Sequence, residues 1–275
     1  IKASLTEAQS RAKILLRFQG AIKIDTQVND DFGDVDSDVR WSKFYHFSAF
    51  LSQEFPLVHK YLSLEKINRH GLLYTWEPPS QADYQAYLKK PFLLMAHQDT
   101  VSVANESLAD WKFDPFEGHV DRNGIMYGRG VHDDKNSLIS ILEGVELLLQ
   151  NDFEPNRTVL LAFGFDEEVS GRRGALEISK FLEQKYGKNG VEFILDEGPG
   201  VMDPVVPAKE VAYATVATAE KGYLDVLIEL KAPGGHSSLA GKHSLIGLMA
   251  EIIVSLENED PFLPVSYTHL TLPTN

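Results

Sequence analysis

The chain has 275 residues, of which 43% are hydrophobic, enough to bury a substantial core and to form one large or two modest domains. Its 40 acidic and 26 basic residues give a net charge of -14, which argues against a nucleic-acid or anionic-lipid surface as partner. The absence of cysteine excludes disulfides and thiolate zinc sites. A zinc ion would have to be held by histidine and carboxylate, the ligand set of open catalytic centres.

The first half of the chain predicts helices followed by strands. Apolar spacing indicates amphipathic helices over about residues 5–20 and 41–53, and strands near 62–68 and 72–76. The apolar run PFLLMA predicts a strand that ends at His97, and the turn-rich stretch 118–130 predicts a hairpin. No stretch approaches the roughly 18 apolar residues of a membrane span. Because the chain begins with Ile1, we expect that a start segment has been lost.

The second half alternates helices with strands. Helical spacing of apolar residues predicts a helix over 134–150, followed by a strand at 159–165, a helix at 173–186 and a strand at 191–195. This order predicts an α/β fold with a mostly parallel sheet flanked by helices, and with function at strand ends. After about residue 218 the pattern changes: 223–231 alternates like a half-exposed strand, and 243–256 has the spacing of an amphipathic helix.

Charged residues gather where several of these strands are predicted to end. Two-residue periodicity turns His97 and Asp99 to the same side of their strand, so one can bind a metal ion while the other orients it. Several carboxylates packed together without a cation would raise one another's pKa values, so such a cluster argues for a bound metal. The segments MAHQDT, GRGVHDDK, FDEEVSG and LDEG supply the candidates His97, Asp99, Asp133, Glu167, Glu168 and Asp196.

Each of these residues taken alone has a simpler explanation. An isolated His97 or Asp196 would more often be structural, and an acidic run such as 166–168 would usually be solvated. Here the run ends a buried apolar strand, where an unpaired charge is costly. Asp134 remains open between a site residue and a structural one. No G-x-S-x-G, H-E-x-x-H or Walker motif is present, and glycosidase chemistry would not explain His97 at a strand end.

In order and residue type, the four segments resemble the metallopeptidase family that contains carboxypeptidase S, aminoacylase-1 and the succinyl-diaminopimelate desuccinylases. DDKNSL, at residues 133–138, is most similar to the carboxypeptidase S branch, and the resemblance spans about residues 10–264. It implies a zinc exopeptidase-like catalytic domain over 1–217, lacking its final segment, and the start of an α+β lid or dimerisation domain over 218–264. Residues 265–275 depart from the family pattern, and we expect a non-native tail there.

The resemblance implies two zinc ions per active site in the full-length protein. His97, Asp133 and Asp196 would hold one ion. Asp133 would bridge to the second, which Glu168 and a late histidine absent from this chain would also hold. A cis peptide bond would follow Asp133, as in relatives.

Three further residues receive roles from the same resemblance. Asp99 would orient the imidazole of His97. Glu167 would be the general base that takes a proton from water and passes it to the leaving amine. His236, in APGGHSS, matches a lid histidine that stabilises the oxyanion in the partner subunit's active site.

Together these expectations describe hydrolysis, by a zinc-activated water, of an amide bond next to a C-terminal or N-acylated amino acid. The substrate is a peptide or, alternatively, an N-acyl amino acid as in aminoacylases. The rival from another class is a catalytically silent, truncated module that binds metal or dimerises, and we expect this chain to hold at most one zinc tightly. The resemblance also implies a homodimer through the lid and a vacuolar or secreted protein. The sequons at Asn105 and Asn156 fit that location.

Overall fold

The computed structural model describes residues 8–79, 89–198, 200–202, 213–214, 216–219, 222–236 and 241–258. The chain divides into two units, residues 1–217 and residues 218–275. The functions expected of these parts, a catalytic domain and a partial lid, stay predictions.

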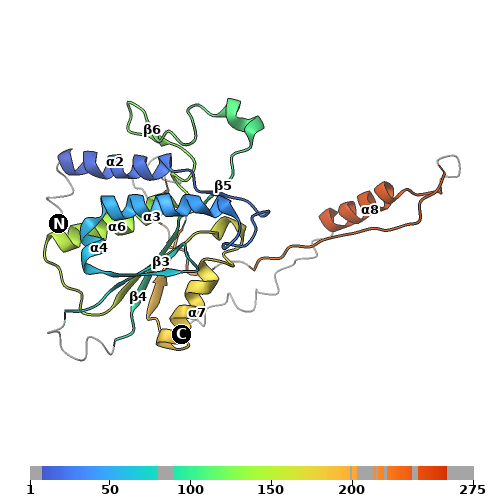
Figure 1. Cartoon of the computed structure of the whole chain (residues 1–275). Coiled ribbons are helices and arrows are strands. Elements are labelled where there is room, and N and C mark those ends of the chain that lie inside the picture. Colours follow the sequence, from blue (N-terminus) through green and yellow to red (C-terminus); the bar gives the residue numbers. More distant parts are fainter. Residues whose placement is uncertain are drawn as a thin grey trace. The chain divides into compact units, whose positions relative to one another are not determined.

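A five-stranded sheet forms the centre of the first unit (Figure 1). Strand β4 runs parallel to β8 and β9, whereas β3 is antiparallel to β2 and β8. The α/β class is confirmed with a mixed sheet, because the short turn between β2 and β3 can join only antiparallel strands. In spatial order the strands are β2 (Ser63–Ile67), β3 (Gly71–Trp76), β8 (Val159–Gly164), β4 (Phe92–His97) and β9 (Phe193–Leu195).

Helices cover both faces of this sheet (Figure 1). On one face, Leu138 and Leu142 of α6 belong to the same core cluster as Phe47 of α3 and Val58 of α4. On the other face, α7 packs its buried Ile178 against the strands. Both faces of β3 and β8 are therefore buried, which explains why their sequences are apolar rather than alternating. The helices are α2 (Ala8–Lys23), α3 (Lys43–Glu54), α4 (Pro56–Tyr61), α6 (Lys135–Gln150) and α7 (Ala175–Tyr186).

The first unit also contains several short elements, of which β1 and β5 lie beside the end of β4 that carries His97. Strand β1 (Gln27–Val28), just after α2, pairs in parallel with β5 (Thr100–Val101), just after β4. The predicted hairpin is confirmed as β6 (His119–Val120) and β7 (Met126–Tyr127). The remaining pair is β10 (Val201–Met202) with β11 (Tyr213–Ala214), and the 3-10 turns are η1 (Val39–Ser42), η2 (Asn105–Asp110) and η3 (Glu167–Val169). The pairing of β1 with β5 places the end of α2 beside the end of β4.

Most expected elements of this unit are confirmed, with small shifts at their ends. The first helix is described from Ala8 onward and continues to Lys23, beyond its expected end near residue 20. The sequence analysis missed α4, because a short helix that starts at Pro56 leaves too few residues to show helical spacing. Strand β9, at the edge of the sheet, is short and exposed.

The second unit contains α8 (Leu245–Asn258), which confirms the helix expected over 243–256. The strand expected over 223–231 is wrong, because the described residues of this stretch form no strand. An alternating pattern yields a strand only when a neighbour supplies hydrogen bonds, and here side chains such as Leu227, 91% exposed, face solvent. The expected tail over 265–275 lies outside the described residues.

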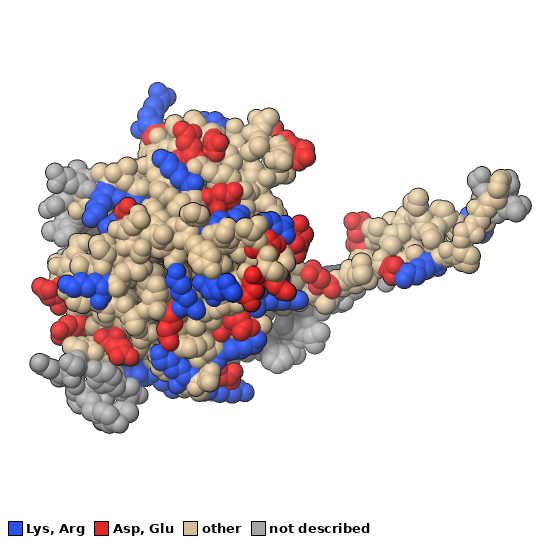
Figure 2. All heavy atoms as spheres, viewed as in Figure 1, with Lys and Arg blue, Asp and Glu red and all other residues tan. Residues whose placement is uncertain are grey.

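Acidic and basic side chains are interspersed over the face of the first unit that Figure 2 draws. No helix among the described residues is long and apolar enough to cross a membrane.

Candidate metal centre

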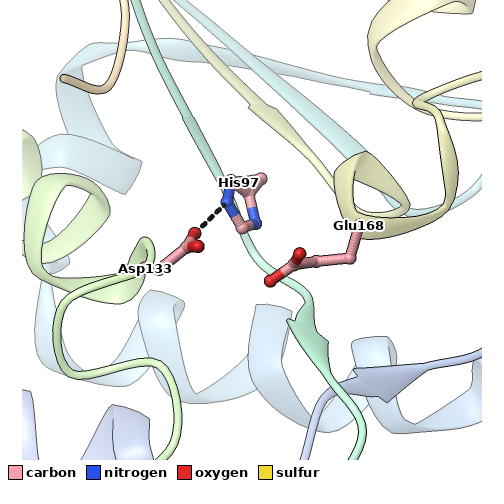
Figure 3. Close-up of side chains that lie close together, drawn as sticks. All are labelled: His97, Asp133 and Glu168. Atoms are coloured by element: carbon pink, nitrogen blue, oxygen red, sulfur yellow. Dashed lines mark hydrogen bonds and ion pairs between the residues drawn. The ribbon is translucent and has the colours of Figure 1, made fainter. Parts of the chain in front are cut away.

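His97 is the last residue of β4 and is buried, with 3% of its surface exposed. Its Nδ1 lies 3.0 Å from the carbonyl oxygen of Asp99 and 3.3 Å from Asp99 Oδ1. Its Nε2 points the other way and lies 2.9 Å from Asp133 Oδ1 (Figure 3). A proton on Nδ1, donated to Asp99, leaves the lone pair of Nε2 free for a metal ion.

Asp99 touches two of the candidate ligands. One carboxylate oxygen faces His97, and the other, Oδ2, accepts a hydrogen bond of 3.0 Å from the backbone N–H of Glu168. The side chain of Asp99 is fully buried. This geometry supports the orienting role expected for Asp99 and adds a contact with the turn that carries Glu168.

Asp133 and Asp134 lie directly before α6. The peptide bond between them is cis, so the prediction made from the resemblance is confirmed. The imidazole of His97 beside it holds the pKa of Asp133 below its usual range. Burial raises the pKa of Asp134 to about 6, and its Oδ2 has no hydrogen-bond partner in the described part of the chain.

Glu167 and Glu168 belong to the 3-10 turn that follows β8. Glu168 Oε1 accepts a hydrogen bond of 3.0 Å from the backbone N–H of Val101. Glu167 Oε2 lies 3.9 Å from His97 Nε2. Burial raises the pKa of Glu167 to about 7, and burial also raises the pKa of Glu168. A carboxylate with a pKa near neutrality suits a general base.

The ligand atoms of His97, Asp133 and Glu168 all lie within 4.8 Å of one another. They come from a strand end, a loop and a turn, and they approach a common space (Figure 3). Burial alone would lower the pKa of His97, but contacts with Asp133, Asp99 and Glu197 outweigh burial and raise it. A site of nitrogen and oxygen donors that favours positive charge at its centre fits a divalent cation.

Glu197 is a candidate ligand that the sequence did not single out. Its Oε2 lies 3.4 Å from His97 Nε2, and it forms a second group of potential ligands with His97 and Asp134. Asp196, the expected ligand, belongs to neither group; it is exposed, and its Oδ1 accepts a hydrogen bond from the backbone of Glu197. The only feature of the sequence that pointed to Glu197 was its position next to Asp196 in LDEG. His236 belongs to the second unit and is exposed.

Histidine and carboxylates meet at the carboxyl end of a strand, in a sheet covered by helices, which places the chain among α/β proteins with a candidate metal site at a strand end. Comparison with known protein families identifies the particular family. The model of the family described as "Peptidase family M20/M25/M40" matches residues 93–269, so the chain belongs to this family.

Curated relatives and solved structures agree with this membership. Carboxypeptidase S of Saccharomyces cerevisiae is 44% identical over 248 residues, which cover 90% of this chain and 41% of that protein. The mouse N-fatty-acyl-amino acid synthase/hydrolase PM20D1 is 34% identical over 90% of this chain and 46% of its own length. The dipeptidase Dug1p of S. cerevisiae shares the fold, with a TM-score of 0.53 at 19% identity over 71% of this chain and 40% of that one. The chain thus spans less than half the length of these relatives.

Proposed function

We propose that this chain carries the metal-binding and proton-transfer groups of a metal-dependent hydrolase that cleaves the amide bond next to a C-terminal carboxylate, as the name carboxypeptidase S describes for its relative. The observation that carries the proposal is the convergence of His97, Asp133 and Glu168 within 4.8 Å. Glu167 stands beside this group with a pKa raised to about 7. Metal ligands and a general base in one place are what hydrolysis by water requires.

The protein groups divide the work of this reaction. His97 would offer Nε2 to a cation, and Asp99 would keep the imidazole proton on Nδ1. Asp133, with two carboxylate oxygens, would bridge two cations, and Glu168 would contact the second. A bound cation would supply Lewis-acid polarisation of the scissile carbonyl and would lower the pKa of water. Glu167 would accept the proton of the attacking water and transfer it to the leaving amine.

We infer zinc as the cation, because histidine with carboxylates and no thiolate is the usual ligand set of a catalytic zinc site. Two ions per site would act in the full-length protein. Asp196, expected from the sequence, and Glu197, favoured by its position, are the two candidates for the remaining ligand of the first ion.

An N-acyl amino acid is the second candidate substrate. The observation that favours it is the 34% identity with the synthase/hydrolase PM20D1, whose name states action on N-fatty-acyl amino acids. A peptide and an N-acyl amino acid present the same amide next to a carboxylate, so the same metal centre would serve both. A metal-binding module without catalytic turnover is the third candidate function.

The second unit would contribute one further active-site residue, to the partner subunit of a homodimer. His236 would act as the oxyanion donor in a homodimer formed through a lid domain, where such a donor is worth roughly 3 kcal/mol of transition-state stabilisation. A vacuolar or secreted location is proposed from the resemblance alone.

The experiment is to measure zinc content by elemental analysis and hydrolysis of two substrates, a blocked dipeptide and an N-fatty-acyl amino acid, with Asp133→Asn as the control. Zinc binding that depends on Asp133, with cleavage of the dipeptide, supports the carboxypeptidase. Preferential cleavage of the acyl amino acid supports the second candidate. Zinc without turnover supports the silent module, and absence of metal binding refutes all three.

A further inference from the structure

Lys135 is a buried lysine next to the candidate metal ligands that the chemistry described above does not use. It is the first residue of α6 and is 0% exposed. Its Nζ donates hydrogen bonds to the carbonyl oxygens of Ala21, at 3.0 Å, and Ile24, at 2.8 Å. It also lies 5.0 Å from the centre of the Phe47 ring. A buried amino group is costly unless such partners satisfy its N–H groups, so the position of Nζ is closely defined.

These two carbonyls belong to the end of α2 and to the residue just after it. The last carbonyls of a helix have no partner within the helix and carry its negative dipole end, so they are natural acceptors for an ammonium group. Lys135 therefore joins α2 to the start of α6. Asp133 lies two residues before Lys135 in the chain, so this contact holds the loop that presents Asp133.

The same segment also contacts the end of β4. Thr26 is fully buried, and its hydroxyl donates a hydrogen bond of 2.7 Å to the carbonyl oxygen of Gln98, the residue between His97 and Asp99. The backbone N–H of Thr100 donates to the carbonyl oxygen of Thr26 at 3.2 Å. Residues 21–26 thus hold both the loop of Asp133 and the strand end of His97.

We propose that residues 21–26, through Lys135 and Thr26, position His97 and Asp133 relative to each other for metal binding. The proposal rests on the proposed function, because it concerns the same metal centre. Lys135 and Thr26 are positioning residues, which touch no cation themselves. Partners that orient metal ligands typically change metal affinity by about 10–100-fold when they are lost.

Two variants remove the two contacts with little change in volume. Lys135→Met removes the amino group and otherwise nearly keeps the length of the side chain, and Thr26→Val replaces only the hydroxyl with a methyl group. The control is Glu143→Gln, which weakens the ion pair with Arg17, at 2.9 Å, that also joins α2 to α6. This control separates general loosening of the two helices from an effect on the metal ligands.

The measurements are the zinc Kd, by competition with a chromophoric chelator, and the visible spectrum of the Co²⁺-loaded chain, with folding checked by circular dichroism. We expect Lys135→Met to raise the zinc Kd at least about tenfold and to alter the Co²⁺ spectrum. Thr26→Val should also raise the zinc Kd and alter the Co²⁺ spectrum. This variant tests the proposal by itself if Lys135→Met does not fold. Glu143→Gln should leave both unchanged.

Wild-type zinc affinity in the folded variants overturns the inference and leaves the proposed function standing. An equal loss in Glu143→Gln also overturns it, because helix packing would then be the cause. If the wild-type chain binds no zinc, the proposed function itself fails, and the inference fails with it.

Discussion

The protein should lose less stability in acid when His70 is replaced by a residue that cannot titrate. His70 is buried, 3% exposed, among the rings of Phe44, Tyr45 and Phe165. Burial lowers its pKa from 6.5 to about 4. The unfolded chain therefore binds a proton that the folded chain rejects, so stability is fully present above pH 6.5 and falls as the pH drops towards 4.

The size of this effect follows from the two pKa values. At about 1.4 kcal/mol for each pH unit between them, His70 costs about 2 kcal/mol of stability at pH ~5 and about 3 kcal/mol at pH ~4, relative to neutral pH. His70→Phe retains a ring for the aromatic contacts and cannot titrate, so this part of the pH dependence disappears.

The assay is urea unfolding of both proteins at pH ~7 and ~5. The stability of His70→Phe relative to wild type should rise by about 2 kcal/mol on going to the lower pH. Other titrating groups are common to both proteins and cancel in the comparison. A relative stability that changes by less than about 0.5 kcal/mol would show that the folded protein accommodates a charged His70, and would refute the reasoning.

Two predictions concern the metal centre itself. Glu167→Gln should lower turnover of the full-length protein by at least roughly 100-fold while zinc content stays constant, because it removes proton transfer but no ligand; parallel loss of zinc would make Glu167 a ligand. Glu197→Gln should weaken zinc binding at least about tenfold, because Glu197 lies beside His97. A larger effect of Asp196→Asn in the same titration would instead support the assignment made from the sequence.

The sequence predicted the parts of this site that depend on local pattern. An apolar run that ends in a histidine indicates a buried strand with a functional end, and β4 ends at His97. The helix after Asp134 follows in the same way from its apolar stripe, and α6 begins at Lys135. These features depend on neighbours in the chain, whose effect on local conformation is strong.

Features that depend on distant contacts were not predictable. The partners of Lys135 are carbonyl groups more than a hundred positions earlier in the chain, and a backbone carbonyl leaves no mark in a sequence. The choice between Asp196 and Glu197 depends on the path of the chain just after the short strand β9. The expected strand over 223–231 failed for the same reason, because a strand needs a partner that its own sequence does not reveal.

The double contact of Asp99 has a consequence for mutational analysis of the metal centre. One buried carboxylate contacts both His97 and the backbone of Glu168. A substitution at either candidate ligand therefore changes the support that Asp99 gives to the other. Free-energy changes at His97 and Glu168 should therefore not add, and a double-mutant cycle between them should reveal coupling that is reduced when Asp99 is replaced. Redesign of the site for another cation would have to vary these three positions together.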